Sequence, residues 1–593
     1  MLDFRSPSLT SGRHRNNLMI TSLRHHPFPR IILIGATLLS WTALSAAAPA
    51  PSAAQVLTPE AFKPYVEKFN AEDDELYANA FPNAMAWDFL AANIPLFQCP
   101  DEDLERTYYF RWWTYRKHVR QSPDGWVITE FLPKVPWSAK DNTICCPAGH
   151  HFYEGRWLAD PKYLDDYATF WFRKGGNPRY YSFWAADAIY AYYLVTGNQA
   201  LVTGLLDDLI KNYEAWEQSH LTPDGLFWQI DDRDGMEVSI GKSGKRATIN
   251  SYMFGDATAI ARIAGLAGRK DVAATYQAKA EHLKQLVQTK LWDPEAKFFK
   301  TLPRTRNELT TPTKSSNIKM ERNNSVRALN DGEGASKEAD LVDVRELHGF
   351  TPWYFNLPDV GKGYEVAWKQ LMDPKGFMAP FGPTTAEQRH PAFKISYEGH
   401  GCQWNGPSWP FATAVTLTAM ANVLHNSPQD SISKEDYLRT LLIYAKSQRR
   451  KLADGRVVSW IDENLDPFTG EWIARKRCEE HNADLVKKGQ PDKVLRERGK
   501  DYNHSSFCDL VITGVVGLRP RADNVVEIHP LVPDGKWDWF CLDKVFYHGR
   551  SLTILWDKTG TKYNKGSGLR VFADGREIAR SETLARVAAP LPE

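Results

Sequence analysis

The sequence has no excess of charge of either sign. Its 73 lysines and arginines are matched by 72 aspartates and glutamates, which leaves a formal net charge of +1. A near-neutral chain has no electrostatic reason to bind nucleic acid or an anionic membrane. The sequence also lacks a second long apolar run after the N-terminal one. We therefore expect no integral membrane association once that first segment is removed.

Cysteines are few, and none has the spacing of a metal site. The seven are Cys99, Cys145, Cys146, Cys402, Cys478, Cys508 and Cys541. An odd count leaves at least one outside any intrachain disulfide. The adjacent Cys145 and Cys146 do not form part of two CxxC pairs. We interpret the cysteines as structural, with unknown connectivity, and we expect neither a metal nor another cofactor.

The N-terminal segment has the three parts of a secretory signal. Basic residues at 24–30 precede the apolar stretch 31–48, and small residues continue to position 54. The most apolar part, 31–41, is too short to cross a bilayer securely. We expect an exported protein, periplasmic or extracellular, with a single membrane anchor as the alternative.

Aromatic side chains are abundant, with 21 Trp, 24 Tyr and 28 Phe. Aromatic rings stack on the C–H-rich faces of sugars, and they also fill large cores. Composition alone leaves both interpretations open.

Apolar residues recur at helical spacing from position 59 onward. Helices are predicted for 180–196, 199–220, 248–266, 271–291, 365–372, 409–424, 434–451 and 506–516. Long loops rich in Trp, Gly, Pro and Asp separate them, and such loops are uncommon unless functional. This pattern predicts a mainly α ring of helical hairpins whose loops build a central pocket.

A small β region is predicted at the C-terminus. Candidate strands cover 525–528, 539–542, 552–556 and 569–572, and Asp574-Gly575 is a hairpin signal. We divide the chain into a signal and linker (1–54), a helical domain (55–518) and a β region (519–593). The polar segment 306–337 is predicted to be a mobile loop or an insertion.

Acidic residues gather in three loops beside Gly and Trp, where a pocket wall would lie. These loops span 227–239, 345–353 and 460–471. Cleavage of a glycosidic bond needs two carboxyl groups, one protonated and one ionised. Each loop alone is a weak signal, because aspartates also build turns and cap helices.

Taken in order, these loops resemble motifs of glycoside hydrolase family 63 and its mannosylglycerate-hydrolase-like relatives, with more distant similarity to trehalases. The matching segments are Asp234-Gly235-Met236-Glu237, Gly349-Phe350-Thr351-Pro352-Trp353, Phe381-Gly382-Pro383-Thr384-Thr385, Trp404-Asn405-Gly406-Pro407-Ser408-Trp409-Pro410 and Glu463-Asn464-Leu465-Asp466-Pro467. The resemblance spans residues 225–516. It implies an (α/α)6 toroid that hydrolyses an α-glycoside with inversion.

The resemblance places Glu237 at the general-acid position and Glu463 at the general-base position. Inversion requires the two carboxyl groups to lie roughly 6.5–9.5 Å apart, which leaves room for a water molecule. Two departures from the family's motifs predict an altered sugar subsite. Glu237 stands where the family has Asp, and Asn405 stands where its signature has Arg. Asp234 remains the alternative acid.

Polar and aromatic residues near these loops complete the predicted site. Charged side chains bind sugar hydroxyls through charge-assisted hydrogen bonds, and aromatic rings stack on the sugar. The substrate-binding candidates are His151, Glu154, Arg156, Trp157, Trp184, Asp187, Trp228, Asp234, Asn250, Trp353, Trp404, Gly406, Trp409 and His504. For the segment 149–187, a buried ion pair between two helices is the alternative.

The predicted function is an exported, inverting glycoside hydrolase acting on O-glycosyl bonds. Its expected partner is a gluco- or manno-configured oligosaccharide or small glycoside. One alternative keeps the helical ring but makes the enzyme a furanosidase, a rhamnosidase or a polysaccharide lyase. A lyase would need a basic groove, which the neutral charge disfavours. A non-catalytic glycan-binding protein is the other alternative, and it would not need two carboxyl groups facing across a cleft.

Overall fold

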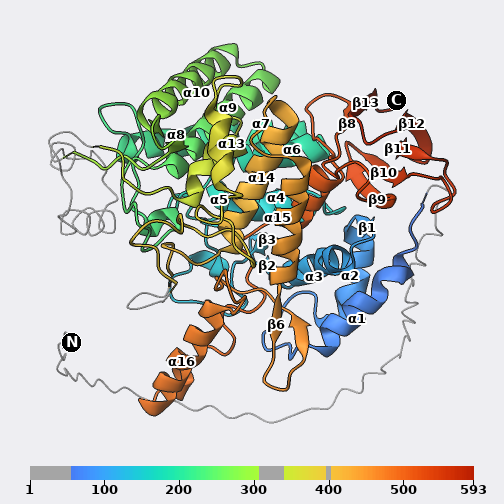
Figure 1. Cartoon of the computed structure of the whole chain (residues 1–593), viewed down its shortest axis with the longest axis horizontal. Helices are drawn as coiled ribbons and strands as arrows, with labels where there is room; N and C mark the ends of the chain where they lie inside the picture. Colours follow the sequence, from blue (N-terminus) through green and yellow to red (C-terminus); the bar gives the residue numbers. More distant parts are fainter. Residues whose placement is uncertain (1–54, 306–339, 396–401, 593) are drawn as a thin grey trace, which may run out of the picture. The chain divides into compact units, whose positions relative to one another are not determined.

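The computed structural model describes residues 55–305, 340–395 and 402–592 (Figure 1). The predicted signal and linker and the predicted loop 306–337 lie outside these residues. None of the described helices is both long and apolar enough to cross a bilayer.

Helices account for most of the regular structure. The described α-helices are α1 (Lys63–Ala71), α2 (Ala86–Asn93), α3 (Glu102–His118), α4 (Ala148–Gly155), α5 (Lys162–Arg173), α6 (Ala185–Thr196), α7 (Gln199–Gly204), α8 (Leu206–His220), α9 (Ala247–Leu266), α10 (Lys270–Lys290), α13 (Thr351–Tyr354), α14 (Pro410–Asn426), α15 (Lys434–Ser447), α16 (Ile473–Lys487) and α17 (Cys508–Leu510).

The described strands are short. They are β1 (Leu96–Gln98), β2 (Val119–Ser122), β3 (Gly125–Ile128), β4 (Trp292–Asp293), β5 (Phe298–Phe299), β6 (Arg449–Lys451), β7 (Val457–Ser459), β8 (Val525–Ile528), β9 (Trp539–Tyr547), β10 (Arg550–Asp557), β11 (Gly568–Ala573), β12 (Arg576–Ser581) and β13 (Val587–Pro590).

Inner and outer helices pack in pairs. α9 packs against α6, α8 and α10, and most of its side chains are buried. α10 buries a single stripe that includes Tyr276, Leu283 and Val287, and it presents Lys and Glu side chains to solvent. An inner helix buried on most sides and covered by an amphipathic outer helix is the hairpin unit of an (α/α) toroid. The predicted mainly α fold is confirmed.

Several helices differ from their predicted bounds. The helix predicted from 180 begins only at Ala185, because the backbone N–H of Ser182 donates to the carbonyl of Arg233 and holds 180–184 as a loop. The helix predicted for 434–451 ends at Ser447, and Arg449–Lys451 pairs with Val457–Ser459 as a hairpin. The segment 199–220 breaks at Leu205, and Tyr364–Gln370 is a 3-10 helix.

The C-terminal β region contains the four predicted strands, as β8, β9, β10 and β11. The β11–β12 hairpin turns at Asp574 and Gly575, whose φ angles are 48° and 81°. Two positive φ angles in succession fit the turn that favours Asp-Gly. The main sheet has the order β1-β9-β10-β11-β12. A strand from the N-terminal part of the chain therefore completes it.

Candidate active site

A pocket of about 500 Å³ opens at one end of the inner helices. Its lining comes from loops that precede α4, α6, α9, α14 and α17, together with α16 and the segment after β3. The polar and aromatic lining residues include Glu130, Trp137, Cys146, Tyr180, Tyr181, Asp232, Arg233, Glu237, Cys402, Trp404, Trp409, Glu463, Arg477, His481, Arg498, Tyr502 and His504. Both predicted catalytic carboxyls therefore line one pocket.

The turn that carries Glu237 is anchored from beneath by a buried ion pair. Arg246 Nε lies 2.8 Å from Asp234 Oδ2, and both side chains are fully buried. The hydroxyl of Thr248 donates to the same oxygen. Gly235 follows with a φ of 72°, and a Cβ there would lie 2.6 Å from Cys146 Sγ. Glycine is therefore required both by the left-handed backbone and by the close approach.

Glu237 is half-buried, and its backbone is fixed by a neighbouring loop. The N–H of Trp404 donates to the Glu237 carbonyl at 3.1 Å. The next residue, Val238, has a φ of 61°, which is a strained conformation for a β-branched side chain. Burial raises the pKa of the Glu237 carboxyl well above its ordinary value, and the charges of Asp232, Asp231 and Glu463 add to this effect.

Glu463 has the opposite electrostatic environment. Its Oε2 accepts a hydrogen bond from Arg477 Nη2 at 2.9 Å and lies 3.8 Å from the Cys402 thiol. Its Oε1 lies 3.5 Å from Arg498. Burial alone would raise the pKa of Glu463, but the two arginines outweigh it and hold the pKa below its usual value. Glu463 is thus ionised at neutral pH.

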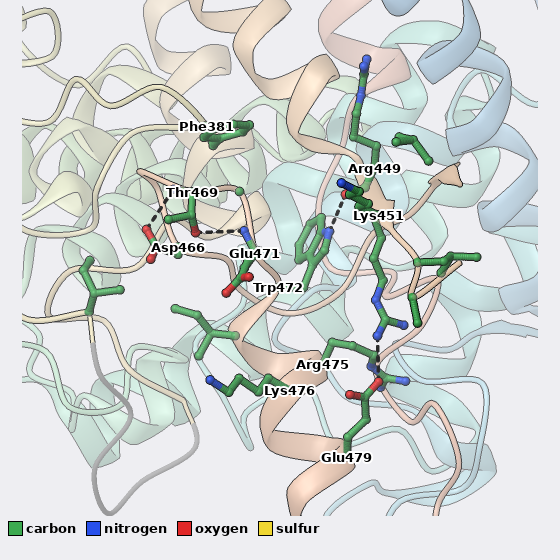
Figure 2. A pocket seen from close by; sticks show the side chains of 17 residues that line it. Phe381, Arg449, Lys451, Asp466, Thr469, Glu471, Trp472, Arg475, Lys476 and Glu479 are labelled. Atoms are coloured by element: carbon green, nitrogen blue, oxygen red, sulfur yellow. Dashed lines mark hydrogen bonds and ion pairs between the residues drawn. The ribbon is translucent and has the colours of Figure 1, made fainter. Parts of the chain in front are cut away.

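The arginine that holds Glu463 belongs to α16, which is anchored beside the preceding acid. Arg475 Nε lies 3.2 Å from Asp462 Oδ2. The adjacent acids Asp462 and Glu463 are therefore each paired with an arginine, and both arginines belong to one turn of α16. Figure 2 shows the other side of α16, where Arg475, Lys476 and Glu479 line a surface cavity of about 990 Å³ against the β6–β7 hairpin. α16 therefore separates that cavity from the carboxylate pocket.

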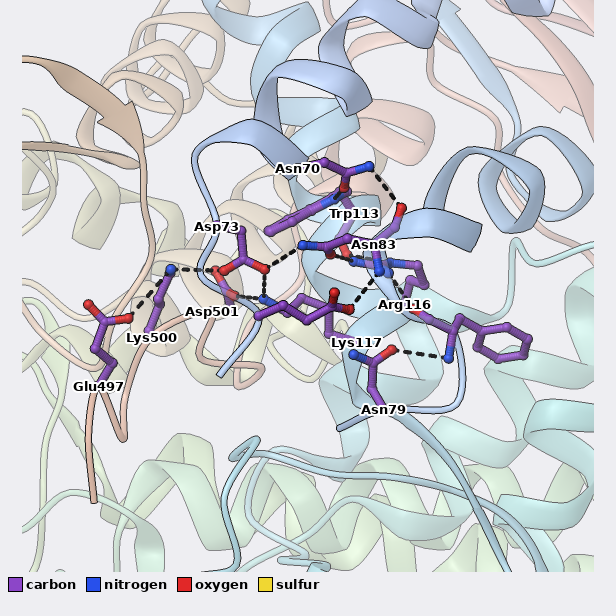
Figure 3. A network of polar contacts seen from close by, with 12 residues as sticks. Asn70, Asp73, Asn79, Asn83, Trp113, Arg116, Lys117, Glu497, Lys500 and Asp501 are labelled. Atoms are coloured by element: carbon purple, nitrogen blue, oxygen red, sulfur yellow. Dashed lines mark hydrogen bonds and ion pairs between the residues drawn. The ribbon is translucent and has the colours of Figure 1, made fainter. Parts of the chain in front are cut away.

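The loop that supplies Arg498, Tyr502 and His504 is anchored by a buried charge network (Figure 3). Lys117 Nζ lies 2.9 Å from Asp73 and 2.6 Å from Asp501, and all three side chains are only 2–3 % exposed. Lys500 also lies 2.9 Å from Asp73. These contacts fix the backbone on the N-terminal side of Tyr502.

Glu130 is a third carboxyl in the pocket. Burial raises its pKa to about 8, the hydrogen bond from the Tyr502 hydroxyl opposes that rise, and the charge of Glu463 adds to it. Glu130 is buried whereas Glu237 is half-buried, so Glu237 is the more accessible of the two neutral carboxyls.

Aromatic rings form one wall of the pocket. Trp404 and Trp409 stack with centroids 4.6 Å apart, and Trp409 lies 6.1 Å from the ring of His504. Burial lowers the pKa of His504 well below its ordinary value, so its imidazole is neutral. Trp137 at the rim is 39 % exposed and lies 5.2 Å below the guanidinium of Arg498. An exposed ring at a pocket mouth is suited to stacking on a sugar.

Eleven predicted binding residues lie outside this lining. Five of them, His151, Glu154, Arg156, Trp157 and Asp187, make contacts elsewhere in the helical ring. His151 hydrogen-bonds to Tyr167 and to the carbonyl of Asn503. Glu154 accepts the backbone N–H groups of Phe507, Cys508 and Asp509. Arg156 and Trp157 both donate to Asp509. Asp187 accepts from the Tyr153 hydroxyl. The alternative prediction for the segment 149–187 was a buried ion pair, and Arg156 and Asp509 form such a pair.

The other six also serve packing or loop positioning in the structure. Trp184 packs against Tyr252 and Tyr354, Trp228 stacks on His220, and Trp353 packs against Trp368. The side-chain amide of Asn250 holds the backbone of Phe227, because its Oδ1 accepts from the Phe227 N–H and its Nδ2 donates to the Phe227 carbonyl. Gly406 donates its N–H to Thr385. Asp234 is engaged with Arg246, as described above.

Several residues of the pocket were not predicted from the sequence. Arg477 lies on an amphipathic helix where a charged residue is ordinary, and Glu130 follows a short strand without any acidic neighbour. Tyr502 lies within the Asp501-Tyr502-Asn503-His504 segment and Arg498 lies just before it, and the polar composition of that segment was the available signal.

Cys99, Cys145, Cys146, Cys478, Cys508 and Cys541 carry free thiols, and Cys146, Cys402 and Cys478 line the pocket. In the described residues, no cluster of three His, Cys, Asp or Glu side chains has the arrangement of a metal site.

A helical toroid with one carboxyl of raised pKa and one of lowered pKa in the same pocket has the features of a glycoside hydrolase, and the family comparison supports that class. The family model of the mannosylglycerate hydrolase MGH1-like glycoside hydrolase domain matches residues 140–505. The chain therefore belongs to this family. A second model, the C-terminal domain of glycosyl hydrolase family 65, matches residues 518–580.

One solved structure agrees in fold over most of this chain. It is a protein titled sialidase, 43% identical with a TM-score of 0.77, and the match covers 90% of this chain but 45% of that one. This chain thus spans less than half the length of that relative. A family GH78 rhamnosidase of Bacillus sp. GL1 is 12% identical (TM-score 0.46, covering 81% and 41%). The GH63 mannosylglycerate hydrolase of Thermus thermophilus in complex with glucose is 13% identical (TM-score 0.34, covering 56% and 73%).

Proposed function

We propose that this glycoside hydrolase cleaves an α-glycosidic bond with inversion, with Glu237 as general acid and Glu463 as general base. The observation that carries this proposal is that two carboxyls lining one pocket have environments that shift their pKa values in opposite directions. Burial keeps Glu237 neutral, and Arg477 with Arg498 keeps Glu463 ionised. Paired carboxyls whose environments drive their pKa values apart take the acid and base roles.

The chemistry proceeds in one displacement. Glu237 donates its proton to the glycosidic oxygen as the bond from that oxygen to the anomeric carbon breaks. Water attacks the anomeric carbon from the opposite face, and Glu463 accepts the proton that the water loses. Within the part of the chain that the structure describes, Oε1 of Glu463 has a single, longer contact, with Arg498 at 3.5 Å. We assign the water to this oxygen because Oε2 is engaged by Arg477.

The substrate we propose is a gluco- or manno-configured oligosaccharide or small glycoside. Trp404 and Trp409 offer an apolar wall for a sugar ring, and Trp137 offers a platform at the rim. The carboxyls of Glu130 and Asp232 can accept sugar hydroxyls within the same pocket.

A second candidate substrate is an α-glycoside of an acidic sugar such as sialic acid. Arg233, Arg477 and Arg498 all line the pocket. Arg477 Nη1 and Arg498 Nε are buried without a hydrogen-bond partner among the described residues. Guanidinium groups bind carboxylates well, and the relative that is 43% identical is titled a sialidase.

We also propose export to the periplasm or the cell exterior. The basic and apolar N-terminal pattern supports this. Fractionation of cells that make the full chain tests it, and a full-length, unprocessed chain confined to the cytoplasm would contradict it.

The function is tested by screening aryl α-glucosides, α-mannosides, α-rhamnosides and α-sialosides, followed by NMR of the first anomer released. We expect hydrolysis of at least one neutral or acidic α-glycoside, with a β-configured first product. Release of the retained α-anomer would refute inversion. Failure of every glycoside, with binding intact, would favour the glycan-binding alternative.

A further inference from the structure

One part of the catalytic pocket is lined by two tyrosines and an adjacent acid and base. Tyr180 and Tyr181 come from the loop before α6, and Asp232 and Arg233 come from the turn that leads to Glu237. The guanidinium carbon of Arg233 lies 4.2 Å from the ring centroid of Tyr180 and 5.0 Å from that of Tyr181. We call these four lining residues the Arg233 cluster.

The backbone of the Arg233 cluster is fixed on both of its segments. The N–H of Ser182 donates to the Arg233 carbonyl at 2.8 Å, which joins the two loops. The N–H of Tyr181 donates to Cys145 Sγ at 3.2 Å. Asp234, the residue after Arg233, is held by the buried ion pair described above. The cluster is therefore a preformed part of the pocket wall.

The polar ends of these side chains are accessible and make no hydrogen bonds within the described part of the chain. The nearest acid to Arg233 is Asp232, and the distance from Nε to Oδ2 is 3.7 Å, too long for a hydrogen bond. The Arg233 and Asp232 side chains are 17 % and 36 % exposed. The half-buried Tyr180 and Tyr181 likewise have hydroxyls without a partner among the described residues. A molecule in the pocket can therefore reach free donors and a free acceptor here.

The Arg233 cluster lies on the side of the pocket that holds the proposed acid. Glu237 follows Arg233 by four residues. Burial raises the pKa of the Tyr181 hydroxyl, the charge of Arg233 opposes that rise, and the charge of Glu237 adds to it. Tyr181 is thus within electrostatic range of both side chains. Because the general acid protonates the leaving-group oxygen, the leaving group lies on this side of the broken bond.

We propose that the Arg233 cluster is the leaving-group subsite, and that it binds a neutral second sugar unit through neighbouring hydroxyls. This inference rests on the proposed function, because it takes Glu237 as the acid. Each sugar hydroxyl can both donate and accept, so two neighbouring hydroxyls match the Arg233 donors and the Asp232 acceptor. The tyrosine hydroxyls extend the same polar surface. An acidic group at Arg233 would also meet the charge of Asp232, which disfavours it.

The test compares substrates that share a glycone and differ in the leaving group. The glycone is the one that the screen above identifies. Its methyl α-glycoside releases methanol, whereas its α-linked disaccharides (for glucose: maltose, nigerose, kojibiose and isomaltose) release a second sugar. We measure kcat/KM on each for the wild type, Arg233→Leu and Arg262→Leu. Arg262 is the matched control, because it also lies over a tyrosine ring, Tyr190 at 5.6 Å, but lines a separate cavity.

We expect Arg233→Leu to lower kcat/KM on the preferred disaccharide about tenfold more than on the methyl glycoside, the cost of a lost charged hydrogen bond. Arg262→Leu should leave the ratio of the two substrates unchanged. If Arg233→Leu does not fold, Tyr181→Phe decides, because it removes only a hydroxyl and should lower the same ratio severalfold.

Two kinds of failure are distinguishable. Equal losses on both substrates, or a wild type no faster on any disaccharide than on the methyl glycoside, would overturn the subsite and leave the proposed function standing. A wild type that hydrolyses no glycoside would instead refute the proposed function, and the subsite with it.

Discussion

At the scale of single residues, the two pocket carboxyls differ through their neighbours. Glu237 has acids around it, and Glu463 has Arg477 and Arg498. Because the arginines hold the pKa of Glu463 low, the base stays ionised into the acid range. The raised pKa of Glu237 keeps the acid protonated above the pH range in which a carboxyl ordinarily loses its proton. Activity should therefore form a broad plateau between the two pKa values.

Replacing Arg477 should shorten the pH range of full activity at its acid end. In Arg477→Gln the pKa of Glu463 rises, so the base is protonated at a higher pH than in the wild type. We expect the acid limb of kcat/KM against pH to move upward by about one unit or more. Lys476→Gln is the control, because Lys476 is exposed on the far side of α16. An unmoved acid limb in Arg477→Gln would contradict the assignment of Glu463 as base.

Part of the candidate site could be predicted from the sequence. Glu237, Glu463, Trp404 and Trp409 were predicted because they lie in segments that resemble family motifs. His504 was predicted from its polar segment, and all five line one pocket.

The segment 151–157 is as rich in polar side chains as those motif loops, yet its helix points these groups at Asp509 and the 507–509 backbone. Composition does not specify which end of a helix faces a pocket. Arg477 could not be predicted either, because only the tertiary fold brings α16 beside Glu463.

At the scale of elements, the loop before α17 depends on buried charges. Lys117 of α3 forms buried ion pairs with both Asp73 and Asp501. Burial would raise the pKa of Asp73, but Lys117 and Lys500 lower it below its usual value. This stabilisation is present above the unfolded pKa of Asp73 and is lost as pH falls through its folded pKa.

Lys117→Met should therefore destabilise the fold strongly. It leaves Asp501 buried without its cation, and we expect a loss of about 3–5 kcal/mol in the free energy of unfolding. Lys63→Met is the control, because the Lys63–Glu67 pair is exposed and worth less than about 1 kcal/mol. Denaturant titration measures both. Equal stabilities of the two variants would show that the network is not structurally important.

At the scale of the whole molecule, the β region and the helices share a sheet. β1 pairs with β9 in the register Leu96–Asp543, and Asp543 Oδ2 accepts the N–H groups of Val56 and Leu57. The strands of the β region were predicted because alternating apolar residues and Asp-Gly mark them. β1 was not predicted, since three residues are too few for a periodic signal.

This shared sheet predicts that the β region and the helices unfold together. Leu542 on β9 is fully buried and pairs with Phe97, so Leu542→Ala should cost about 2–5 kcal/mol. The unfolding transition seen by near-UV circular dichroism and the loss of hydrolysis should then shift together to a lower denaturant concentration. Phe546→Ala in the same strand should be nearly neutral, because Phe546 is 42 % exposed. A separate early transition with activity intact would contradict this coupling.

The central claim concerns the acid and base roles of Glu237 and Glu463, and leaving-group dependence tests it most directly. The measurement is kcat/KM of the wild type, Glu237→Gln and Glu463→Gln on an alkyl α-glycoside and on a dinitrophenyl α-glycoside of the same sugar. Glu237→Gln should lose about 10²–10⁴-fold on the alkyl glycoside but little on the dinitrophenyl one, whose leaving group needs no proton. Glu463→Gln should lose activity on both. Equal losses of Glu237→Gln on the two substrates, or full activity of Glu463→Gln, would contradict the assignment.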